Sequence, residues 1–123
     1  LQASVVSGEL MALLIIDLDH FKAINDRYGH LAGDQCLRET AGLLEKVFGS
    51  SDCLIARLGG EEFGVLVVGA GCADLAKRAE RFRSELAQHP MRLEAGTAFH
   101  LTCSIGLAHY APDLHRGSDA LYA

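Results

Sequence analysis

The chain has 123 residues, of which half are apolar and 22% are charged, and its formal net charge is −5. This size and composition are typical of one globular domain with one hydrophobic core. The negative balance disfavours a protein that binds nucleic acid or an anionic membrane through a basic surface. No apolar run reaches the roughly 20 residues of a membrane-inserted helix, and no signal peptide is visible. We expect a single domain over residues 1–123, truncated at both ends.

The four cysteines are widely spaced and form no CxxC or Cys/His metal pattern. They are Cys36, Cys53, Cys72 and Cys103. This spacing is typical of buried, reduced thiols rather than of a disulfide framework or a zinc site. It predicts a reducing, cytoplasmic location for the domain.

The first predicted element is a strand over residues 10–16, a short apolar run that ends in the β-branched pair Ile15-Ile16. Such a run favours a central strand that is buried on both faces. Asp17 follows directly and is therefore expected at the rim of the sheet, where a site can open. An isolated aspartate in this place is equally typical of a cap on the next helix.

Two helices are predicted next, over residues 20–27 and 31–48. Gly29 lies between them and suits a left-handed helix end. The second helix carries apolar side chains at spacings of four, three and four residues, which form one amphipathic face. These residues are Leu37, Ala41, Leu44 and Phe48.

Residues 53–58 and 62–68 predict two strands of a hairpin, because both residues of the intervening Gly59-Gly60 pair can adopt positive φ. Glu61 and Glu62 follow at once, and neighbouring residues of a strand point to opposite faces. A hairpin tip with two acids can present oxygen ligands to a cation. Taken alone, the motif is more typical of a solvated turn.

A helix over residues 73–88 follows, and His89-Pro90 ends it. Its predicted core stripe consists of Leu75, Ala79, Phe82 and Leu86. A short edge strand within residues 91–97, an alternating strand over 99–110 and the beginning of a helix at 119–122 complete the chain. This order predicts a mixed sheet with helices packed on one face.

If the hairpin pairs beside the first strand, carboxylates from Asp17 and the Glu61-Glu62 pair come close together. Carboxylates in such proximity repel one another unless a cation or a proton lies between them. Mg²⁺ suits such oxygen ligands and takes its remaining ligands from water and phosphates. These acids therefore predict a metal site of this kind.

Residues 19–22 begin a helix whose free N–H groups can bind phosphate oxygens, and Lys22 adds a positive charge. Asn25 and Asp34 carry side chains that can read the edge of a base, since an amide donates and accepts while a carboxylate accepts paired N–H groups. Together with the acids, these residues predict a site for a nucleotide and Mg²⁺.

Several separated motifs, in this order, resemble the GGDEF-domain diguanylate cyclases from about Leu10 onward. The matching segments are residues 17–30 (DLDHFKAINDRYGH), Gly33-Asp34, residues 57–63 (RLGGEEF), Ser104-Ile105-Gly106 and Ala120-Leu121-Tyr122. GGEEF is an active variant of the motif for which that family is named.

The resemblance implies an α/β (α+β) fold: a ferredoxin-like cyclase palm with a mixed antiparallel sheet flanked by helices, related to class III nucleotide cyclases. It implies that two GTP molecules are condensed into cyclic di-GMP with release of pyrophosphate. Because each domain would bind one GTP, catalysis would require a homodimer, brought together by an upstream sensory or regulatory domain. The alternative is a catalytically silent domain that binds GTP or cyclic di-GMP as a sensor.

The resemblance also implies roles for single residues. Mg²⁺ (or Mn²⁺) would be held by Asp17, Glu61 and the carbonyl of Leu18, and Glu61 or Glu62 would help to deprotonate the 3′-hydroxyl. Lys22 and the backbone at Phe21 would contact phosphates. The remaining GTP contacts would come from Asn25, His30, Asp34 and Gly60. Lys22 as a surface lysine and His30 as a helix-capping residue remain open alternatives.

Some positions depart from the family pattern. The inhibitory product site of the family uses Arg-x-x-Asp, and Ser50 and Cys53 stand at those positions here, so we expect that site to be absent. The segment that normally precedes the first strand is missing, and the basic residues that normally follow Ala120-Leu121-Tyr122 would lie beyond Ala123. We expect truncation of the sequence to account for both differences.

Overall fold

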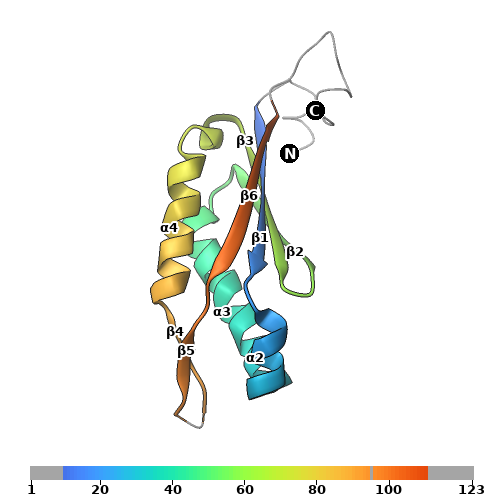
Figure 1. The fold of residues 1–123 in the computed structure, drawn as a ribbon. Coiled ribbons are helices and arrows are strands. Elements are labelled where there is room, and N and C mark those ends of the chain that lie inside the picture. Colours follow the sequence, from blue (N-terminus) through green and yellow to red (C-terminus); the bar gives the residue numbers. More distant parts are fainter. Residues whose placement is uncertain (1–9, 95, 111–123) are drawn as a thin grey trace.

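The computed structural model describes residues 10–94 and 96–110. Its main sheet has four strands in the order β2-β3-β1-β6, and a separate two-stranded ribbon joins β4 to β5 (Figure 1). All described strand pairings are antiparallel. The expected sheet flanked by helices is therefore present. The helix predicted at 119–122 lies outside the described residues.

The N-terminal half closely follows the prediction. Strand β1 covers Met11–Leu18, helix α2 Phe21–Tyr28 and helix α3 His30–Phe48. Strands β2 (Cys53–Gly59) and β3 (Glu62–Val68) form the predicted hairpin. Its tip has the expected glycine geometry, with φ of 150° at Gly59 and 47° at Gly60.

The C-terminal half is more divided than predicted. A 3-10 turn, η1 (Gly69–Cys72), precedes helix α4 (Leu75–Gln88). Strands β4 (Pro90–Arg92) and β5 (Ala98–His100) form a hairpin, and β6 covers Cys103–Tyr110. The single strand predicted over residues 99–110 is thus wrong, because its first residues pair with β4 and the remainder pairs with β1.

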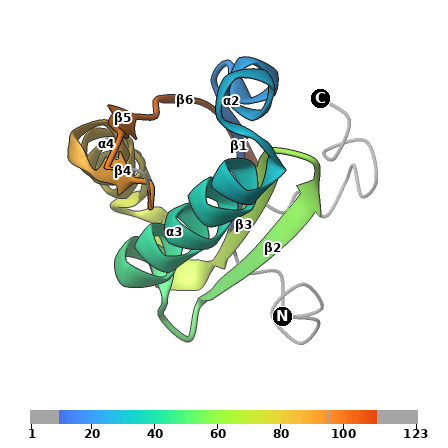
Figure 2. The same cartoon turned by 90° about the horizontal axis from the view of Figure 1, so that it is seen from below.

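The core lies between one face of the sheet and helices α3 and α4, which pack on the same side (Figure 2). Alternate residues of β1 contribute to it: Ala12, Leu14, Ile16 and Leu18. The predicted stripe of α4 is buried in full, and in α3 three of the four predicted residues are buried while Ala41 is partly buried. The 3.6-residue period thus identified the inward faces correctly.

The expectation that β1 is buried on both faces is wrong for the described structure. Leu14 is fully buried, whereas its neighbour Leu13 is 40% exposed. Both α3 and α4 cover the same face of an antiparallel sheet, so alternate residues of β1 point away from them. None of the described helices combines the length and the hydropathy that a bilayer crossing requires.

Candidate functional site

The end of β1 and the tip of the β2–β3 hairpin are joined by backbone hydrogen bonds. Asp17 lies opposite Glu62 in the β1–β3 ladder, and the N–H of Leu18 donates to the carbonyl oxygen of Glu61 at 3.2 Å. Direct cross-strand partners point to the same face of a sheet. The structure therefore brings the predicted acids to one rim, with Asp17 and Glu62 as cross-strand neighbours.

The turn from β1 into α2 is fixed by contacts with the segment before β6. The N–H of Asp19 donates to the carbonyl oxygen of Thr102 at 2.9 Å. Its carboxylate accepts hydrogen bonds from Thr102 Oγ1 (2.7 Å) and Ser104 Oγ (2.8 Å). These two hydroxyl donors, Thr102 first, lower the pKa of Asp19. His20 then adopts a left-handed conformation, with φ of 57°, and α2 begins.

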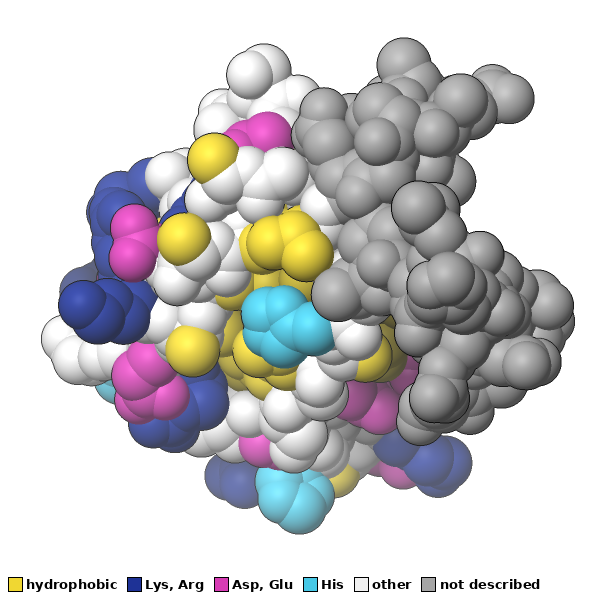
Figure 3. Space-filling view, turned by 90° about the horizontal axis from the view of Figure 1, so that it is seen from above, with side chains coloured by type: hydrophobic (Ala, Val, Ile, Leu, Met, Phe, Trp, Pro, Cys, Tyr) yellow, Lys and Arg dark blue, Asp and Glu magenta, His cyan; other side chains and the backbone are white. Residues whose placement is uncertain are grey.

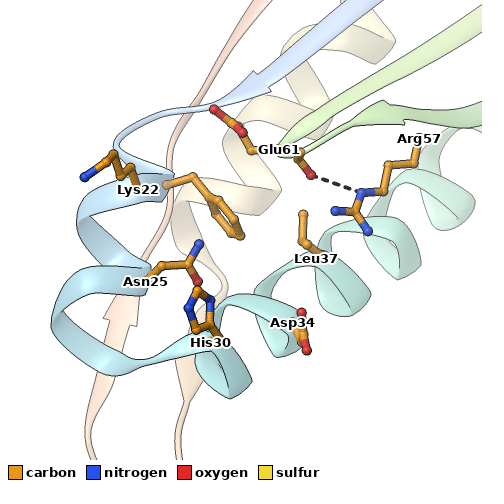
Figure 4. Close-up of a pocket in the computed structure, with 9 residues that line it drawn as sticks. Lys22, Asn25, His30, Asp34, Leu37, Arg57 and Glu61 are labelled. Carbon is orange, nitrogen blue, oxygen red and sulfur yellow. Dashed lines mark hydrogen bonds between the residues drawn. The ribbon is translucent and has the colours of Figure 1, made fainter.

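A cleft of about 330 Å³ opens between α2, the start of α3 and the hairpin tip (Figure 4). Seven predicted site residues line it: Phe21, Lys22, Asn25, His30, Asp34, Gly60 and Glu61. Two lining residues, Leu37 and Arg57, were missed. Leu37 belongs to the apolar stripe of α3 and carries no separate signal. Arg57 is the first residue of the RLGGEEF motif, which was the available clue.

The side chains in the cleft differ in their orientation. In Figure 4, Asn25 extends from α2 towards the start of α3, where His30 and Asp34 lie, whereas the ammonium of Lys22 points away from them. Lys22 Nζ forms an ion pair with Asp26 Oδ2 at 3.1 Å. Arg57 Nε donates to the carbonyl oxygen of Gly60 at 3.0 Å and thereby braces the hairpin tip.

The predicted metal ligands are divided between the cleft and the adjoining rim. Glu61 lines the cleft, while Asp17 and Leu18 do not. Glu62, which was predicted as a catalytic acid and not as a metal ligand, is also not among the residues that line it. Within residues 10–94 and 96–110, no cluster of three His, Cys, Asp or Glu side chains is suited to a metal ion. The predicted ligands are the carboxylates of Asp17 and Glu61 and the carbonyl oxygen of Leu18. All three are hard oxygen donors, and they lie on adjoining backbone segments. Such donors fit Mg²⁺, which needs only one or two protein carboxylates.

The positions of the expected product site hold a different set of contacts. Ser50 Oγ donates to Asp52 Oδ1 at 2.5 Å, and this bond is the main cause of the lowered pKa of Asp52. Arg78 Nη2 from α4 lies 3.4 Å from both Ser50 Oγ and Cys53 Sγ. Cys53 is partly buried, and the other three cysteines are buried.

A second hollow lies at the opposite end of the sheet, where apolar side chains gather around a histidine (Figure 3). Its lining residues are Leu10, Gly69, Ala70, Cys72, Ala73 and His109. Among the residues that the structure describes, no carboxylate lines this hollow, so these residues do not supply the oxygen ligands expected of the site.

The model of the family described as "Diguanylate cyclase, GGDEF domain" matches residues 1–123. The diguanylate cyclase DgcP of Pseudomonas aeruginosa is 39% identical over 121 residues, which are 94% of this chain and 18% of DgcP. The chain spans less than a third of the length of the curated relatives with which it was compared.

Two solved structures are also similar. The GGDEF domain of PA1120 (YfiN or TpbB) from Pseudomonas aeruginosa has a TM-score of 0.80 and 35% identity, covering 98% of this chain and 79% of that one. The GGDEF domain of DgcB from Caulobacter crescentus, solved in complex with c-di-GMP, has a TM-score of 0.82 and 29% identity, covering 98% and 75%. The chain therefore belongs to the GGDEF-domain family of diguanylate cyclases.

Proposed function

We propose that this domain condenses two GTP molecules into cyclic di-GMP with release of pyrophosphate. The observation that carries the proposal is the cleft itself, which gathers seven of the predicted residues from α2, α3 and the hairpin tip. Its volume of about 330 Å³ lies within the usual range for small-molecule sites. Its polar side chains converge from segments that are distant in the sequence, as a binding site requires.

Each part of the cleft suits one part of the nucleotide. Asn25 and Asp34 offer an amide and a carboxylate for the donors and acceptors of guanine. The backbone at Phe21, at the first turn of α2, presents N–H groups to phosphate oxygens. Lys22 is close enough in sequence to reach the same phosphates once it leaves Asp26. A base and its phosphates can thus bind along α2.

The acids at the rim have two tasks in this proposal. Mg²⁺ or Mn²⁺ would be held by Asp17, Glu61 and the Leu18 carbonyl. The ion would neutralise part of the negative charge of the phosphates. Glu61 or Glu62 accepts the proton of the 3′-hydroxyl that attacks the α-phosphate. Positioning and electrostatic stabilisation account for most of the catalysis of phosphoryl transfer.

Catalysis requires two copies of the domain. Each cleft offers one set of base-reading side chains, so one domain binds one GTP, and two domains face each other to join two nucleotides. Activity would then depend on the remainder of the protein, which brings two domains together.

The deciding experiment incubates the full-length protein with GTP and Mg²⁺ and measures cyclic di-GMP and pyrophosphate by chromatography. We expect product from the wild type and none from Glu62→Ala. Glu94→Ala serves as a matched control, because Glu94 is an exposed acid that does not line the cleft. A dimeric protein that binds GTP but forms no product would support the sensor alternative. Absence of GTP binding would refute the cyclase and leave only a sensor of cyclic di-GMP.

A further inference from the structure

Gly33 is buried within α3, where glycine is among the least favourable residues for a helix. The same helix contains a second glycine, Gly42, which is exposed. A Cβ atom on Gly42 would meet nothing within 4 Å. The two glycines therefore differ in their surroundings, and only Gly33 has neighbours that a side chain would disturb.

A Cβ atom on Gly33 would overlap Asn25 Oδ1 and would lie 2.9 Å from Asn25 Cγ. It would also lie 3.3 Å from Cζ of Phe21. Real Cβ atoms essentially never approach another heavy atom within 3.0 Å. The amide of Asn25 thus occupies the space that any side chain at position 33 would need.

Asn25 has little freedom to make room while keeping its amide in the cleft. Its backbone is fixed within α2, and its carbonyl oxygen accepts a hydrogen bond from the N–H of Gly29 at 2.8 Å. Only the two side-chain torsions remain, and a Cβ on Gly33 would force them to turn the amide away from α3. Asp34 is the next residue of α3 and would keep its own place.

We propose that Gly33 is a positioning residue for guanine selectivity, because its missing side chain lets the Asn25 amide lie against the start of α3 (Figure 4). This inference rests on the proposed function, in which Asn25 and Asp34 read the base. An amide held in this place turns its oxygen towards α3 and its NH₂ group towards the cleft, where the O6 of guanine can accept a hydrogen bond from it. Guanine and adenine carry opposite groups at the edge that these side chains would read, so a displaced amide loses discrimination.

The test compares Gly33→Ala with Gly42→Ala in the full-length protein. Both substitutions favour the helix equally, but only the first displaces Asn25. Equilibrium dissociation constants are measured for GTP and ATP. We expect Gly33→Ala to weaken GTP binding about tenfold, the loss expected for the hydrogen bonds of one amide. We expect unchanged ATP binding, whereas Gly42→Ala keeps both affinities.

A double-mutant cycle identifies the route of the effect. In the Asn25→Ala background, Gly33→Ala has no amide to displace and is expected to leave GTP affinity unchanged. In the absence of nucleotide, the side-chain NH₂ resonances of Asn25 are expected to shift in Gly33→Ala and not in Gly42→Ala. If Gly33→Ala fails to fold, recovery of the fold by Asn25→Ala supports the contact and a persistent defect overturns it.

Unchanged GTP selectivity in Gly33→Ala, or an equal loss in the Asn25→Ala background, overturns the positioning role alone. Absence of GTP binding by both the wild type and Gly42→Ala refutes the proposed function, and with it any role of Gly33 in guanine recognition.

Discussion

The N–H of Leu18 donates a hydrogen bond to the carbonyl oxygen of Glu61 at 3.2 Å. It continues the β1–β3 contact beyond the last ladder pair, Asp17 with Glu62. Acids from two distant segments therefore meet at one rim of the sheet. Without this backbone contact, Asp17 at the end of β1 and the two glutamates of the hairpin tip would not lie at the same rim.

Replacing Asp17 by Asn is expected to abolish cyclic di-GMP formation while stabilising the metal-free domain. Asp17 lies directly opposite Glu62, and like charges in this arrangement are destabilising. Removing one charge is expected to raise the free energy of unfolding by about 0.5 kcal/mol. Urea unfolding in EDTA measures this change, and the product assay measures the loss of activity. Glu94→Gln is the control for removal of an exposed charge; equal stabilisation by both variants would contradict the explanation.

Lys22→Ala is expected to lower kcat about 100-fold with little effect on stability. The ion pair of Lys22 with Asp26 is exposed, with 90% and 66% of the two side chains accessible, and such pairs contribute little. Loss of one group that stabilises transition-state charge typically costs this factor in rate. Steady-state kinetics and thermal unfolding measure the two effects. Lys77→Ala, which removes an exposed lysine of α4, should change neither.

Asp26→Asn provides an independent check on Lys22. It releases the ammonium from its partner and is expected to leave stability unchanged within about 0.5 kcal/mol. If Lys22 contacts phosphates, the released lysine keeps or increases kcat. A fall in kcat as large as that of Lys22→Ala would mean that the ion pair itself, rather than the free lysine, is required.

Thr102→Val is expected to destabilise the domain at neutral pH and much less in acid. The hydroxyls of Thr102 and Ser104 lower the folded-state pKa of Asp19 below its ordinary value of 3.8. A lowered folded-state pKa contributes stability that is present above the unfolded value and is lost as the pH falls through the folded value. Removing one donor should cost about 0.5 kcal/mol at pH 7.

Urea unfolding of wild type and Thr102→Val at pH 7 and at about pH 3 measures this dependence. The exposed Thr97 gives a matched control, Thr97→Val. A difference between wild type and Thr102→Val that stays constant with pH would show that the hydroxyl acts without Asp19.

Cyclic di-GMP is expected not to bind or inhibit through the region of Ser50 and Cys53. The side chains there bond to one another and to Arg78, and the Arg-x-x-Asp pair is missing. Titration calorimetry tests the wild type, and the combined Ser50→Arg and Cys53→Asp variant is expected to gain binding. Binding by the wild type that Arg78→Ala removes would contradict this prediction.

The local sequence was sufficient to predict the helices, the hairpin and most of the cleft. Apolar spacing identified the buried faces of α3 and α4, and Gly59-Gly60 identified a turn that requires positive φ. Asn25 and Asp34 were recognised from the hydrogen-bonding chemistry of their side chains, and His30 from the resemblance to the GGDEF family. These features depend on local conformation, which neighbouring residues largely determine.

Only the tertiary structure decided which surfaces meet. It showed that one face of β1 is covered, that Lys22 is paired with Asp26, and that Leu37 and Arg57 reach the cleft. It also placed the Asn25 amide over Gly33. A periodic pattern identifies an apolar face but not what packs on it, because contacts between distant segments depend on how the whole chain closes around its core.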